Sequence, residues 1–201
     1  MNRLLITLML LGTSQAAGLS GPMMQLKESN SRIDRILKRH PVAGTPEERS
    51  AKEELKSVVN QLLDYQELAH RALAQHWDTI TPTQRGEFVA TLKQLIEKNY
   101  VRQLRNATLD YQVIYKGENV ADSVATVDTV VKVKTKGKST ESSIDYKLRK
   151  IDDRWMVFDI ITDEVSMVRN YRNQFNKIIT NESYDALLRK MRKKIEESDP
   201  K

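Results

Sequence analysis

The side chains most able to do chemistry in this chain of 201 residues are its three histidines, because the sequence contains no cysteine. They are His40, His70 and His76, and the last two are six residues apart. Six residues correspond to about 240° around a helix, so these two rings do not share a metal ion as residues four apart would. A zinc site would then depend on carboxylates, and nothing in the sequence suggests such a grouping. We therefore expect no metal site.

Nucleophilic and phosphate-binding motifs are also missing, since the sequence has no G-x-S-x-G, P-loop or G-x-G-x-x-G pattern. Ser166 precedes an amphipathic helix, where its hydroxyl is better placed to cap the helix than to attack a substrate. Asp159 falls within a predicted strand, and a buried carboxylate there is more commonly a partnered structural group. We therefore assign no catalytic residue and expect that the protein is not an enzyme.

The stretch from Asp153 to Ile179 positions these two residues. Its segment Trp155–Ile161 is rich in aromatic and branched residues and predicts a strand, followed by a turn at Thr162–Glu164. The helix that follows carries apolar residues on one face. They are Met167, Val168, Tyr171, Phe175, Ile178 and Ile179. A strand that leads straight into such a helix indicates a helix packed against a sheet.

This stretch resembles the signature of the periplasmic phospholipid-binding proteins of the Mla (maintenance of lipid asymmetry) pathway, the MlaC-like or toluene-tolerance proteins. The family usually reads W-x-V-[YF]-D-[VI]-x-x-[DE]-G-[VI]-S-[LM]-V-x-N-Y-R-x-Q-F. The matching residues are Trp155, Val157, Phe158, Asp159, Ile160, Asp163, Val165, Ser166, Met167, Val168, Asn170, Tyr171, Arg172, Gln174 and Phe175. Glu164 stands where the family usually has glycine, and it is strained if that position takes a positive φ.

A second segment resembles the same family, whose members commonly read D-[YF]-x-E-L-A-x-x-A-L-x-x-x-W and then [LI]-T-x-x-Q-R-x-E-F. The matching residues are Asp64, Tyr65, Glu67, Leu68, Ala69, Ala72, Leu73, Trp77, Ile80, Thr81, Gln84, Arg85, Glu87 and Phe88. The two matches occur in the family's order. The resemblance covers the chain from about position 55 to 195.

Helices are predicted on both sides of the middle of the chain. One runs from Met23 to Arg39, and others begin at the capping signals Thr45–Pro46, Asp64 and Thr81–Pro82. A last amphipathic helix follows the break at Thr180–Asn181. Its basic run RKMRKK is interrupted by apolar residues, which favours a solvated or docking face over a nucleic-acid site.

The apolar period changes from 3.6 to 2 in the middle of the chain, which indicates strands. The predicted strands are 109–115, 124–134, 143–150 and 155–161, and the predicted turns are Lys116–Asn119, Lys136–Lys138 and Ile151–Arg154. Such short connections predict an antiparallel meander of about four strands. The expected fold is therefore α+β, with N- and C-terminal helices wrapped around the sheet.

The first residues have the features of a secretory signal. Arg3 precedes an apolar run from Leu4 to Leu11, and small residues precede a cleavage site after Ala16. We expect a signal peptide at 1–16, an N-terminal helical segment at 17–45, a single domain at 46–197 and a tail at 198–201. Export of a chain without cysteine, which has no site for lipoprotein acylation, predicts a periplasmic protein, and the net charge of +6 is modest.

The resemblance implies a helix-wrapped sheet, similar in general shape to nuclear-transport-factor-like folds, that encloses an apolar lipid cavity. It implies a carrier that needs no cofactor and holds a phospholipid as cargo. Its implied partners are an inner-membrane ABC transporter complex with a lipid-binding ring protein and an outer-membrane lipoprotein–porin complex. We expect a monomer that does not bind nucleic acid.

Alternation along the predicted elements selects the residues expected to line the cavity. They are Leu92, Ile96, Tyr100, Val127, Val131, Val133, Tyr146, Leu148, Val157, Tyr171 and Phe175, with Arg172 as a candidate for the lipid head group. Two alternatives remain open at this point. One is a small enzyme that acts on an apolar molecule through Asp128, Asp145 or Asp159, and the other is a structural envelope protein with a solid core.

Overall fold

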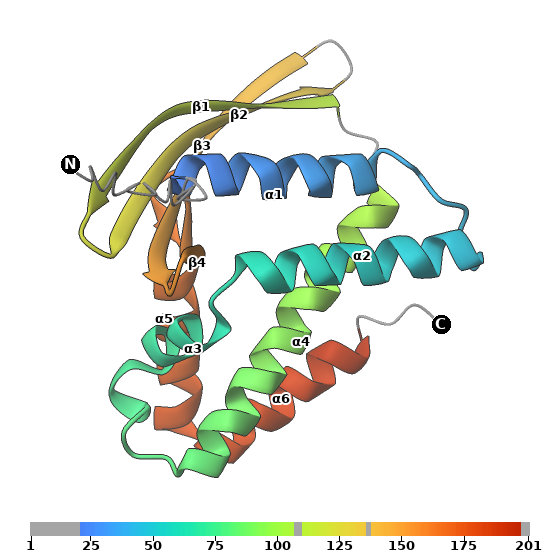
Figure 1. The fold of residues 1–201 in the computed structure, drawn as a ribbon. Helices are drawn as coiled ribbons and strands as arrows, with labels where there is room; N and C mark the ends of the chain where they lie inside the picture. The colour runs from blue at the N-terminus through green and yellow to red at the C-terminus, as the bar shows by residue number, and fades with distance from the viewer. Residues whose placement is uncertain (1–20, 107–109, 136–137, 198–201) are drawn as a thin grey trace, which may run out of the picture.

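A computed structural model describes residues 21–106, 110–135 and 138–197, and it combines six α-helices with one antiparallel sheet (Figure 1). The α+β class predicted from the sequence is confirmed. The expected signal peptide at 1–16 and the tail at 198–201 lie outside the described residues.

The helices begin where the sequence places capping residues. They are α1 (Pro22–Leu37), α2 (Pro46–Leu62), α3 (Tyr65–Leu73), the short 3₁₀ helix η1 (Ala74–His76), α4 (Pro82–Asn106), α5 (Met167–Asn181) and α6 (Tyr184–Glu197). The side chains of Thr45, Asp64 and Ser166 each accept a hydrogen bond from the backbone amide three residues further on. These bonds satisfy amides that have no partner within the first helical turn.

The strands form a meander in chain order, with every neighbouring pair antiparallel. They are β1 (Asp110–Ala121), β2 (Val124–Thr135), β3 (Lys138–Ile151), β4 (Arg154–Thr162) and β5 (Val165–Ser166). The sequence predicted about four strands, and the fifth is a pair of residues that leads into α5. Leu109, the first residue of the strand predicted at 109–115, lies outside the described residues.

The predicted turn at Lys116–Asn119 is wrong. These residues lie inside β1, where the register against β2 shifts between Tyr115 and Gly117. A glycine within a strand marks a bulge as readily as a turn, and the bulge lets the strand continue. The chain reverses later, at Asp122, which adopts a positive φ of 53° suited to a two-residue hairpin.

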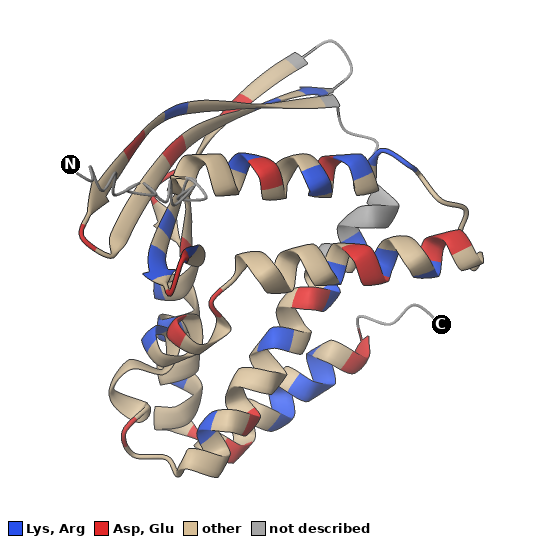
Figure 2. Cartoon of the chain, in the orientation of Figure 1, with Lys and Arg blue, Asp and Glu red and all other residues tan. Residues whose placement is uncertain are grey.

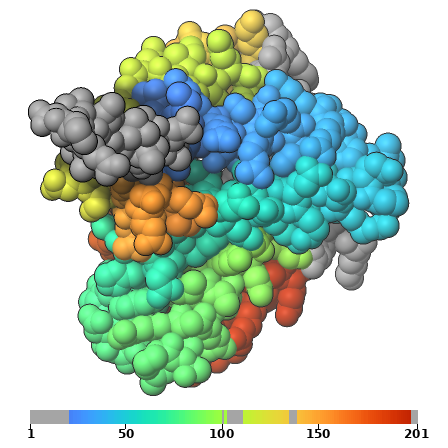
Figure 3. All heavy atoms as spheres, viewed as in Figure 1, coloured from blue at the N-terminus to red at the C-terminus, as the bar shows by residue number. Residues whose placement is uncertain are grey.

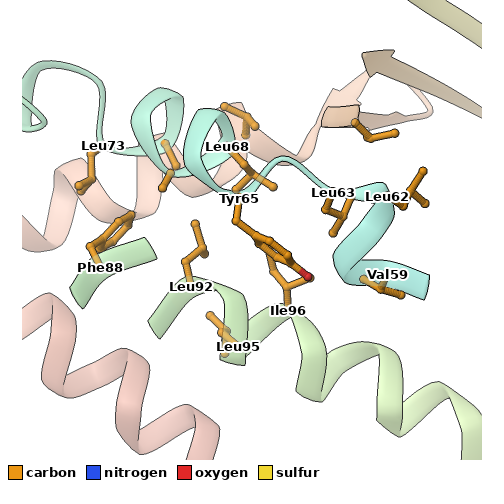
Figure 4. Packing of buried hydrophobic residues seen from close by; sticks show 14 of the residues in the cluster. Val59, Leu62, Leu63, Tyr65, Leu68, Leu73, Phe88, Leu92, Leu95 and Ile96 are labelled. Carbon is orange, nitrogen blue, oxygen red and sulfur yellow. The ribbon is translucent and has the colours of Figure 1, made fainter. Parts of the chain in front are cut away.

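The core lies where the helices meet one end of the sheet. Figure 4 shows Leu62, Leu63 and Tyr65, from the α2–α3 junction, opposite residues of α4 such as Leu92 and Ile96. The junction is tied to β4, because Leu63 forms a bridge with Val157 and the amide of Asp64 donates to the Val157 carbonyl at 2.8 Å. The helices are therefore fixed to the sheet at this end.

Candidate functional site

The inner face of the sheet is apolar, and its residues come from the alternating positions predicted by the sequence. Val127 lies opposite Tyr146, and Leu148 lies opposite both Ala125 and Val157. Of these, Ala125, Val127, Leu148 and Val157 are at most 2% exposed. This end of the inner face is filled by the protein's own side chains.

The other end of the same face is open. Val131 and Val133 continue the inner row of β2 and lie opposite Val113 and Tyr111 of β1. All four residues are only half-buried, although they lie on the face that is fully buried further along the strands. Inner apolar side chains that keep contact with solvent indicate apolar surface that the chain does not fill. We call these four residues the open end of the sheet.

Helix α1 lies between β1 and α2 and contacts both (Figure 3). Its contacts with β1 include two hydrogen bonds: the Asn30 side-chain amide donates to the Tyr115 hydroxyl at 2.9 Å, and the Met23 amide donates to Glu118 at 2.8 Å. The Tyr111 hydroxyl is hydrogen-bonded to Asp34, and burial, followed by this carboxylate, raises the pKa of Tyr111 to about 12. Helix α1 therefore holds the edge of the sheet through polar contacts.

The remaining predicted lining residues lie in two places. Leu92 and Ile96 are buried in α4 against the α2–α3 junction, and Tyr146 is half-buried on the inner face. Tyr171 stacks on Phe175 with centroids 5.3 Å apart, and the Phe175 ring meets Phe88 of α4 edge-on at 5.6 Å. These two aromatic residues thus belong to a helical cluster. The side chain of Tyr100 lies outside the described part of the structure. Which of these residues contact lipid stays a prediction.

Arg172 is exposed, and its Nε atom donates to the backbone carbonyl of Arg71 at 3.0 Å. That carbonyl belongs to the last turn of α3, where backbone acceptors lack helical partners. The guanidinium of Arg71 lies over the Phe158 ring, 4.4 Å from its centroid. Arg172 therefore ties α5 to the end of α3, and its contact with a head group stays a prediction.

The three acidic residues considered for catalysis do not meet at the inner face. Asp159 is a partnered structural group, as expected, because it accepts from the Ser166 hydroxyl at 2.7 Å and the Val168 amide at 3.0 Å. Asp128 lies opposite Asp145 on the outer face, since their neighbours Val127 and Tyr146 point inward. Burial, and then the charge of Asp128, raise the pKa of Asp145. This pair faces away from the open end.

The histidines have other contacts. The His76 ring lies 2.9 Å from the side-chain oxygen of Asn176, and the His70 ring meets Trp77 edge-on. Among the residues that the structure describes, no three histidine, cysteine, aspartate or glutamate side chains are grouped to hold a metal ion. No helix within the same residues is long and apolar enough to cross a membrane.

Sequence reasoning did not select Tyr111 and Tyr115, which line the edge of the inner face. Their alternation with Val113 along β1 was a usable signal. Their partners Asn30 and Asp34 could not have been found in this way, because they lie about 80 residues earlier in a helix.

The described fold can be compared with known proteins. The profile of the MlaC protein family matches residues 27–193. A phospholipid-binding protein from Ralstonia solanacearum, solved in complex with a phospholipid, superimposes with a TM-score of 0.70 at 21% identity, over 89% of this chain and 99% of that chain. A SEC-C motif protein from Rhodopseudomonas palustris reaches a TM-score of 0.27 at 17% identity, over 65% of this chain and 88% of its own. A search of curated proteins finds no match. Because the match to the family profile covers most of this chain, the chain belongs to the MlaC family.

Proposed function

We propose that this protein is a periplasmic phospholipid carrier that houses acyl chains between the inner face of its sheet and its helices. The observation that supports the proposal is the open end of the sheet, where the inner valines Val131 and Val133 are only half-buried. Membership of the MlaC family and the fold of a protein solved with phospholipid point the same way.

The energy of lipid transfer explains why such a carrier is needed. Each methylene group exposed to water costs about 0.8 kcal/mol, so a tail of about fifteen methylenes costs roughly 12 kcal/mol. That cost makes free diffusion through an aqueous compartment very slow. A protein removes most of it by offering apolar surface in place of water, and this requires no catalytic residue.

The proposed partners follow from the family. The carrier would exchange phospholipid with an inner-membrane ABC transporter complex and with an outer-membrane lipoprotein–porin complex. Export through the predicted signal peptide at 1–16 would bring it to the space between these two membranes. We propose that it acts as a monomer, with Val131, Val133 and Tyr146 among the residues next to the acyl chains.

Two adjacent valines of β2 test the proposal. Val131 faces inward and Val130 faces outward, and both are half-buried. We would measure transfer of a fluorescent phospholipid from donor to acceptor vesicles by wild type, Val131→Glu and Val130→Glu, and confirm folding by circular dichroism. A carboxylate beside an acyl chain loses its hydration without gaining a partner, whereas one on the outer face stays in water.

The expected result is transfer by wild type and Val130→Glu, and strongly reduced transfer by folded Val131→Glu. Equal transfer by the two folded variants would show that acyl chains do not occupy the inner face. Failure of the wild type to transfer any phospholipid would contradict the carrier function itself.

A further inference from the structure

The loop between α1 and α2, residues 38–45, carries an exposed apolar side chain at its tip. Val42 is 72% exposed, more than any other large hydrophobic residue in the described part of the chain. Pro41 precedes it, and the concavity beside the loop, about 510 Å³ in volume, is lined by both residues and by Arg39. An exposed valine on its own would be ordinary. Its surroundings distinguish this one.

Basic residues gather just before the tip. Arg35, Lys38 and Arg39 lie within the last turn of α1 and the start of the loop, and Figure 2 shows this end of α1 in blue. Lys38 and Arg39 pair with Asp34 and Glu54, respectively, but these pairs are exposed to solvent. Exposed ion pairs contribute little to stability, so an anionic surface can compete for these cations.

A second exposed valine provides the contrast. Val165 is 62% exposed and follows Asp163 and Glu164, so its immediate surroundings are acidic. The two valines are therefore similar in exposure, and they differ in the charge of the residues that precede them in the chain. Of these two valines, Val42 is the one that follows basic residues, whose positive charges an anionic lipid surface attracts.

The loop follows the end of α1 that reaches the open end of the sheet. Asp34, which contacts Tyr111 at that end, is one helical turn before Lys38. Figure 1 shows the α1–α2 loop on the same side of the molecule as the start of β1 and the end of α4. A membrane in contact with the loop would therefore lie on the same side of the molecule as the open end of the sheet.

We propose that the α1–α2 loop docks directly on an anionic phospholipid bilayer, with Val42 inserted at the interface and Arg35, Lys38 and Arg39 facing the lipid phosphates. The inference rests on the proposed function, since it concerns where the carrier meets its cargo. The bilayer supplies both an apolar layer for the valine and negative charge for the cations.

The test is co-sedimentation of the purified protein with vesicles of phosphatidylglycerol and phosphatidylcholine or of phosphatidylcholine alone. We expect binding to the anionic vesicles that weakens at about 1 M salt, where the screening length is about 3 Å. Val42→Asp should bind these vesicles at least about tenfold more weakly, because it loses the apolar contact and adds a negative charge that the lipids repel. The matched control Val165→Asp should bind as the wild type does.

A second variant reports insertion directly. Val42→Trp should show a blue shift of its fluorescence on anionic vesicles, against a constant background from the buried Trp77 and Trp155. Lack of wild-type binding to anionic vesicles, or equal weakening by Val42→Asp and Val165→Asp, would overturn the proposal. Native mass spectrometry separates this outcome from the carrier function, because Val42→Asp should still co-purify with phospholipid.

Discussion

The turn between β4 and β5 contains two consecutive non-glycine residues in the left-handed region, Asp163 with a φ of 45° and Glu164 with a φ of 68°. The Glu164 side chain makes no hydrogen bond or ion pair within the part of the chain that the structure describes. Asp163 does: its side chain accepts from the Ser143 amide at 2.9 Å, and its own amide donates to the Ser143 carbonyl at 3.1 Å. We therefore expect substitution by glycine to have opposite effects at these neighbouring positions.

The expected size follows from two opposing contributions at Glu164. The left-handed conformation costs an L-residue about 1–2 kcal/mol, which glycine avoids. Glycine also gives the unfolded chain more freedom, which costs about 0.4–1 kcal/mol. Glu164→Gly should therefore stabilise the protein by about 0.5–1 kcal/mol, a rise in Tm of about 1–4 °C for a chain of this size.

Asp163→Gly is the control. Aspartate tolerates the left-handed region better than glutamate, so glycine relieves less strain there, and the loss of the hydrogen bond to Ser143 should lower stability by up to about 1 kcal/mol. Both variants would be compared with wild type by urea unfolding followed by circular dichroism. A Glu164→Gly variant that is unchanged or less stable would refute the inference that glutamate is strained in this turn.

Three further predictions concern partnered polar groups. Arg149 pairs with the buried Asp64, so Arg149→Met should lower the free energy of unfolding by about 2–4 kcal/mol, and a loss below about 1 kcal/mol in urea would count against a buried pair. Asp159→Ala strands two donors at the start of α5 and should cost about 2–3 kcal/mol in thermal or urea unfolding, whereas wild-type stability would show those bonds to be dispensable. Burial raises the pKa of Tyr111 and of Tyr184 to about 12, above the unfolded value of 10.0, so their contribution to stability is present below pH 10 and is lost as pH rises towards 12. The urea midpoint of the wild type should fall between pH 10 and pH 12, and it should fall less in a double variant with Tyr111→Phe and Tyr184→Phe. The same dependence of the midpoint on pH in both proteins would contradict the raised pKa values of these tyrosines.

Local signals in the sequence predicted most of the elements correctly. The caps at Thr45, Asp64 and Ser166 depend on contacts three residues away, and the structure contains all three. The prediction of a turn around Gly117 was wrong. The backbone freedom of glycine allows a bulge as well as a turn, and the structure has a bulge there. Only the pairing of β1 with β2 distinguishes these two outcomes.

The site was less accessible to sequence reasoning than the fold. Alternation placed Val127, Val131 and Val133 on one face, and the structure confirms that they share it. It could not show that the row is filled at one end and open at the other. That difference depends on where α1 lies. Its position is set by contacts such as the hydrogen bond between Asn30 and Tyr115, which are 85 residues apart in the sequence and show no local signal.

The most direct test of the carrier function is native mass spectrometry of the mature protein purified from cells, followed by organic extraction of the same sample. The carrier function predicts an added mass of phospholipid size that is recovered in the extract as a diacyl lipid. A protein that carries no lipid, and that also takes up none from vesicles, would contradict it.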